Sequence, residues 1–434
     1  MRSFSSYPCS GPSARKPTLL ASVTSGIAGT LWVSRLSGAA VAAVAVATNT
    51  ENVLLGVALV FASGTTVLVA HARGARDPAG VRTAVRGGAV LCALVTPSVV
   101  AAGFTLREPL ARLVLGGSDP AALRLATAYF AISLPGTAVF FAQQLVDGIL
   151  KGAGDTRTPM RLALLANGLI LVCDPFLVHR YGVRGAAVST VLCRSAALAA
   201  GIAVLRRDPL LRTAARVRPT TRPGPSALRT LATGLPMSAD FTLRQGGALV
   251  LVAVVGRLGV TAVAAYAIAY KTLYLATMAF YAVRQAAAIH TAHTRGAGAD
   301  ACGDIGRQAV LLSGALGLTA AVLFAGTAPW VMAAFGAGPA VAHQGALFLR
   351  CVGPYLLLMA GFIALGGVFE GSGGAPALPR ITLLGTAVQL PLAAALSGLR
   401  LPGVALALAV SMAVQCAAVA TLSRRALSTA GVPA

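Results

Sequence analysis

The sequence contains little charge. Charged residues make up 11% of its 434 residues, whereas hydrophobic residues make up 56% and the mean hydropathy is +0.78. An ordinary soluble domain carries about 25% charged residues, because most of its surface faces water. A chain with this composition cannot cover itself with polar side chains. The composition therefore excludes a soluble protein and predicts one whose solvent is the lipid bilayer.

Acidic residues are scarcer than basic ones. There are 12 Asp and Glu residues against 35 Lys and Arg residues, which gives a formal net charge of +23. In a soluble protein this excess would indicate nucleic-acid binding. Here the arginines lie singly or in short groups between apolar runs, without a basic stripe that alternates with aromatic residues. The positive-inside rule accounts for this distribution, so we expect no nucleic-acid partner.

The cysteines form no recognisable motif. They are scattered, with no CxxC pair and no histidine at the spacing of a metal site. The seven residues are Cys9, Cys92, Cys173, Cys193, Cys302, Cys351 and Cys416. We expect small apolar side chains here, and no disulfide framework, metal site or cofactor.

Long apolar runs fill most of the chain. A membrane helix needs about 20 apolar residues to cross a hydrocarbon core of about 30 Å. Twelve segments meet this requirement, at 17–35, 41–70, 86–106, 121–148, 160–178, 184–205, 231–256, 261–290, 307–328, 340–368, 377–397 and 402–422. The predicted fold class is therefore an all-α polytopic membrane protein with twelve transmembrane helices.

The distribution of Lys and Arg predicts the orientation. Most of them fall on the side of the membrane that holds the termini and the even-numbered loops, including the arginines of 73–86 and 206–229. The positive-inside rule assigns that side to the cytoplasm. We expect a multi-pass protein of the cytoplasmic membrane with both termini inside.

The chain contains an internal repeat. The run RLSGAAVAA at 35–43 matches RLGVTAVAA at 257–265, and HARGA at 71–75 matches HTRGA at 293–297, both at an offset of 222 residues. Further on, GILKGAG at 148–154 matches GVFEGSG at 367–373, at an offset of 219. Small loop deletions explain the change of offset. Two six-helix bundles with the same orientation, related by a pseudo-twofold axis along the membrane normal, are predicted.

The repeat predicts the domain organisation. It comprises a disordered cytoplasmic tail (1–16), an N-terminal six-helix lobe (17–206), a cytoplasmic linker (207–229), a C-terminal six-helix lobe (230–423) and a second cytoplasmic tail (424–434). The linker is rich in Arg and Pro and is predicted to be partly extended and stiff. Two similar lobes that enclose a cleft suit alternating access by rocking.

The run GAGDTRTPM at 152–160 indicates a tight turn between two helices. Its glycines permit a positive φ, and Asp155 or Thr158 can cap the helix that follows. This run resembles the hallmark of the multidrug and toxic compound extrusion (MATE) family, and RLG at 257–259 and RGAG at 295–298 support the resemblance. The resemblance implies a twelve-helix exporter that ejects organic compounds in exchange for H⁺ or Na⁺.

Asp174 is the candidate coupling residue. An ionisable group inside a membrane is costly and is by default a functional hypothesis. Asn167 and Asp174 lie in a segment similar to the N-x-x-N-x-x-x-D-P pattern of the MATE branch that has its coupling carboxylate in the N-terminal lobe. Burial favours the neutral form of a carboxyl group, so Asp174 is expected to load and release a proton. A hydrated Asp at the membrane interface is the alternative.

Two departures from that branch favour protons over sodium. Its acidic residue in the first span falls on Gly29 here, and its second asparagine falls on Ile170. A sodium cage needs several oxygen ligands, and this lobe lacks two of them. Thr190 is a candidate polar neighbour of Asp174. The expected coupling ion is H⁺, with Na⁺ as the alternative.

The C-terminal half contains a different set of candidates for a substrate cleft. Asp240 and Arg244 are four residues apart, so they share a helix face and can pair. A neutral structural unit is the alternative for this pair. At the offset of 222, Lys271 corresponds to Asn49, two residues before Glu51. Lys271 and Glu51 could therefore occupy related positions in the two lobes as a charge pair that faces the substrate, or could simply make the cleft polar.

Aromatic residues and arginines complete the candidate cleft. Tyr270 and Tyr274 form one helical stripe with Tyr266, which either packs in the interior or stacks on a planar drug. Arg284 is expected to snorkel to a cytoplasmic helix end. Two further arginines, Arg194 and Arg350, are expected to line the cleft. This surplus of cations favours zwitterionic or anionic cargo.

The predicted function is secondary active antiport, in which small organic compounds leave through the cytoplasmic membrane in exchange for protons. The alternatives are a flippase for lipid-linked anionic precursors and a degenerate paralogue that no longer transports. An intramembrane enzyme is excluded, because the histidines lie at helix ends without Ser, Cys or Glu at a useful spacing. The expected partners are a small organic substrate and the bilayer, and the chain is expected to be a monomer.

Overall fold

The computed structural model describes residues 38–115, 120–217, 221–299 and 301–430, and every regular element in these ranges is a helix. The helices are α2 (Gly38–Gly74), α3 (Pro78–Leu115), α4 (Pro120–Gly152), α5 (Arg157–Tyr181), α6 (Val183–Arg207), α7 (Pro209–Arg216), α8 (Pro223–Gly256), α9 (Val260–Gly296), α10 (Cys302–Ala334), α11 (Pro339–Cys351), α12 (Gly353–Ser372), α13 (Ala377–Ala395), the short 3₁₀ helix η2 (Leu396–Leu399) and α14 (Arg400–Ala430).

The helices have the length and composition of membrane spans. The described residues contain ten stretches long and apolar enough to cross a membrane, and the last of these, Ala377–Leu422, contains both α13 and α14. Large apolar side chains such as Phe176, Leu249 and Trp330 are more than 70% exposed, as a lipid-facing surface requires. The predicted fold class is confirmed. The first predicted span, 17–35, lies outside the described residues.

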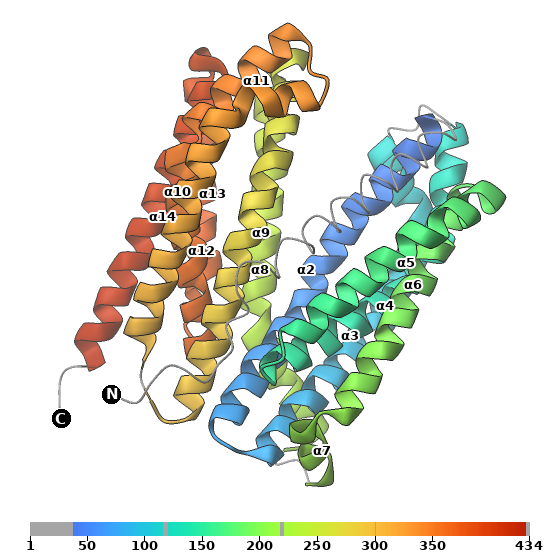
Figure 1. Cartoon of the computed structure of the whole chain (residues 1–434), viewed down its shortest axis with the longest axis vertical. Coiled ribbons are helices and arrows are strands. Elements are labelled where there is room, and N and C mark those ends of the chain that lie inside the picture. The colour runs from blue at the N-terminus through green and yellow to red at the C-terminus, as the bar shows by residue number, and fades with distance from the viewer. Residues whose placement is uncertain (1–37, 116–119, 218–220, 300, 431–434) are drawn as a thin grey trace. The chain divides into compact units, whose positions relative to one another are not determined.

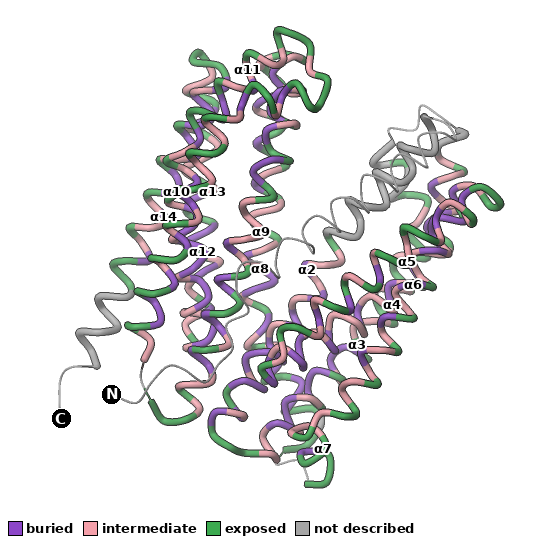
Figure 2. The backbone as a smooth tube through the Cα atoms, viewed as in Figure 1, coloured by how far each residue is buried: buried purple, intermediate pink, exposed green. Residues whose placement is uncertain are grey.

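The chain divides into two compact units. The first comprises residues 1–69 and 78–231, and the second comprises residues 70–77 and 232–434. Figure 1 shows each unit as a bundle of long helices. In the first unit α4 packs against α3 and α6, and α5 packs against α6. In the second, α12 packs against α9, α10 and α14. Within each unit the buried residues form stripes along the helices (Figure 2).

The internal repeat recurs as a repeated helix contact. In the first half, a Cβ atom added to Gly148 or Gly152 of α4 would meet the carbonyl oxygen of Ala62 or Thr66 of α2, respectively. Such a G-x-x-x-G spacing lets two membrane helices approach closely. The hydroxyl of Thr66 also donates to the carbonyl of Gly148, at 3.0 Å.

The second half repeats this contact with the corresponding residues. A Cβ at Gly367 or Gly371 of α12 would meet the carbonyl oxygen of Arg284 or Ala288 of α9. These four residues are the counterparts of Gly148, Gly152, Ala62 and Thr66 at the offsets of 219 and 222. The turns after α4 and α12 also agree, since Gly154 and Gly373 have φ of 91° and 86°. The duplication therefore preserves backbone packing in both units.

Two boundaries differ from the prediction. The span predicted at 340–368 is two helices, α11 and α12, because Pro354 lies in the first turn of α12 and interrupts the hydrogen bonding of a continuous helix. The linker predicted at 207–229 as partly extended is largely helical in its described part, because residues 209–216 form α7 and residues from Pro223 onward belong to α8. Asp208 caps α7 by accepting a hydrogen bond of 3.1 Å from the amide of Leu211.

Candidate functional site

The turn between α4 and α5 has the predicted geometry. Gly154 adopts a positive φ, and Asp155 caps α5 by accepting hydrogen bonds from the amides of Arg157 and Thr158 at 3.0 and 2.9 Å. The Thr158 hydroxyl donates to the same carboxylate. Of the two caps that the sequence allowed, Asp155 is the one that forms. This turn fixes the start of α5, which carries Asp174.

Asp174 is buried in the described interior of the first unit. Its residue exposure is 7%, and it lies on α5 on the side that faces α6. Ser189 lies beside its carboxylate, and the thiol of Cys193 is also near. Among the residues that the structure describes, neither Oδ1 of Asp174 nor Oγ of Ser189 has a hydrogen-bond partner. A buried carboxylate with an unfilled acceptor is costly to keep charged without a partner.

The other two predicted coupling residues occupy different surroundings. Asn167 is half-buried on α5. Thr190 follows Ser189 on α6, but its hydroxyl donates to the carbonyl of Ala186, at 3.0 Å. The side chain beside Asp174 is thus Ser189, which the sequence analysis did not single out.

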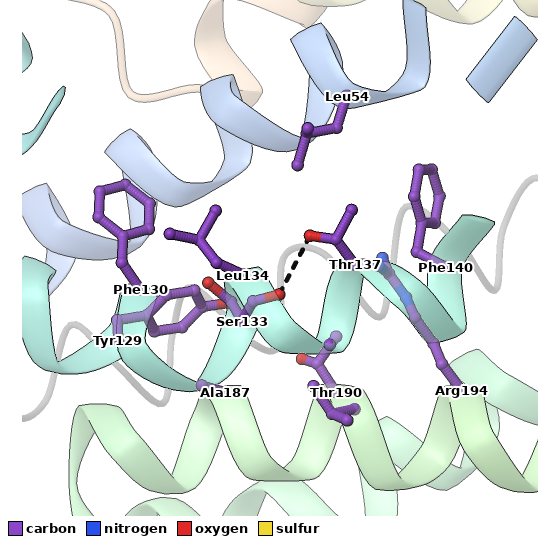
Figure 3. A pocket seen from close by; sticks show the side chains of 12 residues that line it. Leu54, Tyr129, Phe130, Ser133, Leu134, Thr137, Phe140, Ala187, Thr190 and Arg194 are labelled. Atoms are coloured by element: carbon purple, nitrogen blue, oxygen red, sulfur yellow. Dashed lines mark hydrogen bonds between the residues drawn. The ribbon is translucent and has the colours of Figure 1, made fainter. Parts of the chain in front are cut away.

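Thr190 instead lines a small pocket formed by α2, α4 and α6 (Figure 3). The cavity has about 30 Å³ of space for water-sized molecules, room for one or two waters. Its polar lining includes Ser133 and Thr137, and Arg194 lies over the ring of Phe140 at 5.2 Å from the ring centroid. Arg194 thus lines a pocket inside the first unit, and its predicted place in the cleft between the lobes stays a prediction.

The second unit contains a cluster of buried charges around Asp240. Asp240 is 1% exposed and accepts hydrogen bonds from Arg244 at 3.1 and 3.3 Å, so the pairing predicted from their spacing is present. The Thr382 hydroxyl of α13 also donates to Asp240, at 2.5 Å. The guanidinium of Arg244 lies over the ring of Phe362, 4.8 Å from its centroid. The cluster therefore connects α8, α12 and α13.

The snorkelling predicted for Arg284 is wrong. Its side chain is 2% exposed and donates to Asp240 at 3.1 Å and to the sulfur of Met237 at 2.9 Å. It does not snorkel to the membrane surface, because Asp240 offers a charged partner inside the bundle. Glu370 of α12, which the sequence analysis did not consider, lies 3.7 Å from Nε of Arg284. The internal repeat distinguishes Glu370, because at the offset of 219 this acidic residue corresponds to a basic one, Lys151.

The predicted substrate residues of α9 are accessible. Lys271, Tyr270 and Tyr274 are exposed, whereas Tyr266 is buried and stacks on Tyr270 with 5.9 Å between ring centroids. The stripe thus has one end in the core and the other at the surface of the unit. The side chain of Glu51 lies outside the described part of the chain, so its relation to Lys271 stays a prediction.

Comparison with known proteins identifies the family. The MatE family model matches residues 18–176 and 236–395, one segment in each half of the chain. The chain is 27% identical over 232 residues to the probable multidrug resistance protein YpnP of Bacillus subtilis, a match that covers 53% of this chain and 51% of YpnP. It is 30% identical over 177 residues to the probable multidrug resistance protein NorM of Thermotoga maritima, covering 39% of this chain and 37% of NorM. The matches thus span about half or less of these relatives.

Solved structures share the fold. A MOP superfamily transporter from Pyrococcus furiosus, described as having a binding pocket of reverse polarity, has a TM-score of 0.85 at 20% identity, covering 96% of this chain and 94% of that one. An outward-facing multidrug resistance MATE family transporter has a TM-score of 0.85 at 21% identity, covering 95% and 93%. Together with the family-model match over both halves, these findings show that the chain belongs to the MATE family of membrane transporters.

Proposed function

We propose that the protein is a secondary active antiporter that exports small organic compounds across the cytoplasmic membrane in exchange for protons. The relatives named as probable multidrug resistance proteins support organic cargo. The excess of Lys and Arg in the even-numbered loops supports cytoplasmic termini. The proposal depends above all on the environment of Asp174.

Asp174 can serve as the site where the proton binds. It lies within a membrane-spanning helix, it is buried, and its Oδ1 has no hydrogen-bond partner in the described part of the chain. The groups beside it are a hydroxyl and a thiol, from Ser189 and Cys193. A sodium ion would require several oxygen ligands, which this set does not provide. A proton needs only the carboxylate itself, so this arrangement favours proton coupling.

The cargo would contact the exposed side of the second unit. Tyr270 and Tyr274 offer aromatic faces to a planar molecule, and Lys271 between them offers a positive charge. Asp240 and Arg244 would form the polar floor, with Arg244 16% exposed at its side chain. Cargo that joins an aromatic ring to an acidic group fits this combination.

The test is export by the purified protein in proteoliposomes under an imposed pH gradient. Asp174→Asn keeps the size of the side chain and removes the titration, so export driven by the gradient should fall to the level of empty liposomes. Asp304→Asn, at an exposed acid in the first turn of α10, is the control and should export normally. Undiminished proton-driven export by Asp174→Asn would overturn the proposal.

A further inference from the structure

Glu370 is a buried carboxylate with a weak ionic contact. It lies in the last turn of α12 with 9% side-chain exposure, and its Oε2 is 3.7 Å from Nε of Arg284. That nitrogen has no hydrogen-bond partner within the described residues. Asp240, in contrast, accepts hydrogen bonds from Arg244, Arg284 and Thr382. Protonation of Asp240 would weaken several of these hydrogen bonds, whereas protonation of Glu370 breaks none. Glu370 is therefore the carboxylate of the cluster that can take up a proton with the smaller loss of interactions.

The charges of the cluster are balanced when Glu370 is ionised. Two carboxylates, Asp240 and Glu370, face two guanidinium groups, Arg244 and Arg284. Two further titratable side chains of α9, which packs on α12, lie near the cluster. Tyr281 lies against Arg284, with 5.8 Å between the guanidinium carbon and the ring centroid, and the exposed Arg295 donates to the carbonyl of Ser372, two residues from Glu370. Ile305 and Ala309 of α10 add apolar contacts. A proton on Glu370 thus changes the cluster from neutral to a net charge of +1.

We propose that Glu370 is a second proton-binding carboxyl of this transporter, located in the second unit and acting through Arg284 on the charge presented by Asp240 and Arg244. This inference rests on the proposed proton-driven export. Protonation frees Arg284 from its contact with Glu370 and leaves Asp240 shared between two arginines. The added positive charge changes how strongly the cluster attracts or repels charged groups on the cargo.

The pair formed by Arg284 and Glu370 has no counterpart at the corresponding positions of the first half. At the offsets of 219 and 222, Lys151 stands where the second half has Glu370, and Ala62 stands where it has Arg284. The glycine contacts around these positions are the same in both halves. The second half therefore holds two opposite buried charges that helix packing alone does not need. Glu370 is also two residues from the end of α12, on the side predicted to be cytoplasmic, which gives the proton an exit.

The experiment is infrared difference spectroscopy of the purified full-length protein between acidic and alkaline buffer, in which the C=O stretch reports protonated carboxyl groups. We expect Glu370→Gln to remove one carboxyl band that titrates in the unmodified protein. The matched control is Glu108→Gln on α3, an exposed glutamate paired with Arg112 at 3.7 Å, which should leave that band in place. A full set of bands in Glu370→Gln would overturn the proposal.

A double variant keeps the test decisive if the single variant does not fold. Arg284→Gln combined with Glu370→Gln removes one charge of each sign, so Asp240 and Arg244 remain balanced. A folded double variant should lack the same band, and persistence of that band would contradict the inference. The spectra need no cargo or gradient. Normal export by Asp174→Asn would therefore reject the proposed function without changing the infrared result.

Discussion

The two halves of the chain preserve the same helix contacts but hold different charges. In both halves, paired glycines bring one long helix against the backbone of another, at Gly148 and Gly152 in the first and at Gly367 and Gly371 in the second. Among the described residues, the first half buries the carboxylate of Asp174 in α5, whereas the second buries a network of two acids and two arginines.

This difference shows which features duplication constrains. A glycine that lies against a carbonyl oxygen has no room for any side chain, so both copies must retain it. A buried charge needs only a partner of opposite sign, and the partner can come from any neighbouring helix. The halves could therefore diverge in electrostatics while their packing stayed the same.

The largest effect is expected from Asp240→Asn, which removes the charge at the centre of the second half. Arg244 and Arg284 would then be left with a single carboxylate, Glu370, which lies 3.7 Å from Arg284. Loss of one partner of a buried ion pair costs about 3–5 kcal/mol. Thermal unfolding in detergent should show a large loss of stability relative to Asp304→Asn. An unchanged midpoint would mean that the network does not hold the second half together.

A smaller effect, of the same sign in both halves, is expected from Gly148→Ala and Gly367→Ala. Alanine usually stabilises a helix by about 1 kcal/mol relative to glycine. Here the new Cβ would meet a backbone oxygen, so overpacking should cost about 1–3 kcal/mol instead.

Each half offers a matched control for the glycine test. Gly168 of α5 and Gly361 of α12 have nothing within 4 Å of an added Cβ. Gly168→Ala and Gly361→Ala should therefore leave the unfolding midpoint unchanged or raise it. If only one of the two packing glycines proved sensitive, the halves would not share the contact that the repeat predicts.

The smallest effect is expected from Asp155→Ala, which removes a cap that only the first half has. Its counterpart at the offset of 219 is Gly374, which has no side chain. Loss of the cap should cost about 1 kcal/mol. Thr156→Ala is the control, because the side chain of Thr156 makes no capping hydrogen bond. Equal stability of the two variants in thermal unfolding would contradict the capping role.

The sequence contained the features that depend on local pattern. Apolar run length predicted the spans, matching runs at a nearly constant offset predicted the repeat, and the glycines of 152–154 predicted the turn at Gly154. The sequence also contains Pro354, which explains the break between α11 and α12. Hydropathy alone does not show this break, because residues 340–368 are mostly apolar and were predicted as one span. The pairing of Asp240 with Arg244 followed from helix geometry, because both lie on one helix.

The buried charge network and the neighbour of Asp174 could not be predicted, because they depend on contacts between distant parts of the chain. Arg284 and Glu370 lie on different helices, and nothing in their local sequence shows that they meet. A position near a helix end suggested snorkelling for Arg284, but an arginine with a carboxylate within reach can stay inside. Ser189 was missed for a similar reason, since its neighbour Thr190 resembled the expected polar residue and only the packing of α5 on α6 distinguishes the two.

The central claim, that export is coupled to protons through Asp174, is tested most directly by reversing the flux. Proteoliposomes without an imposed pH gradient are given a gradient of cargo, and the internal pH is followed with a trapped dye. The account predicts that cargo movement drives protons in the opposite direction, and that Asp174→Asn abolishes this proton movement. Cargo movement without any change in pH, or an equal proton flux in Asp174→Asn, would contradict it.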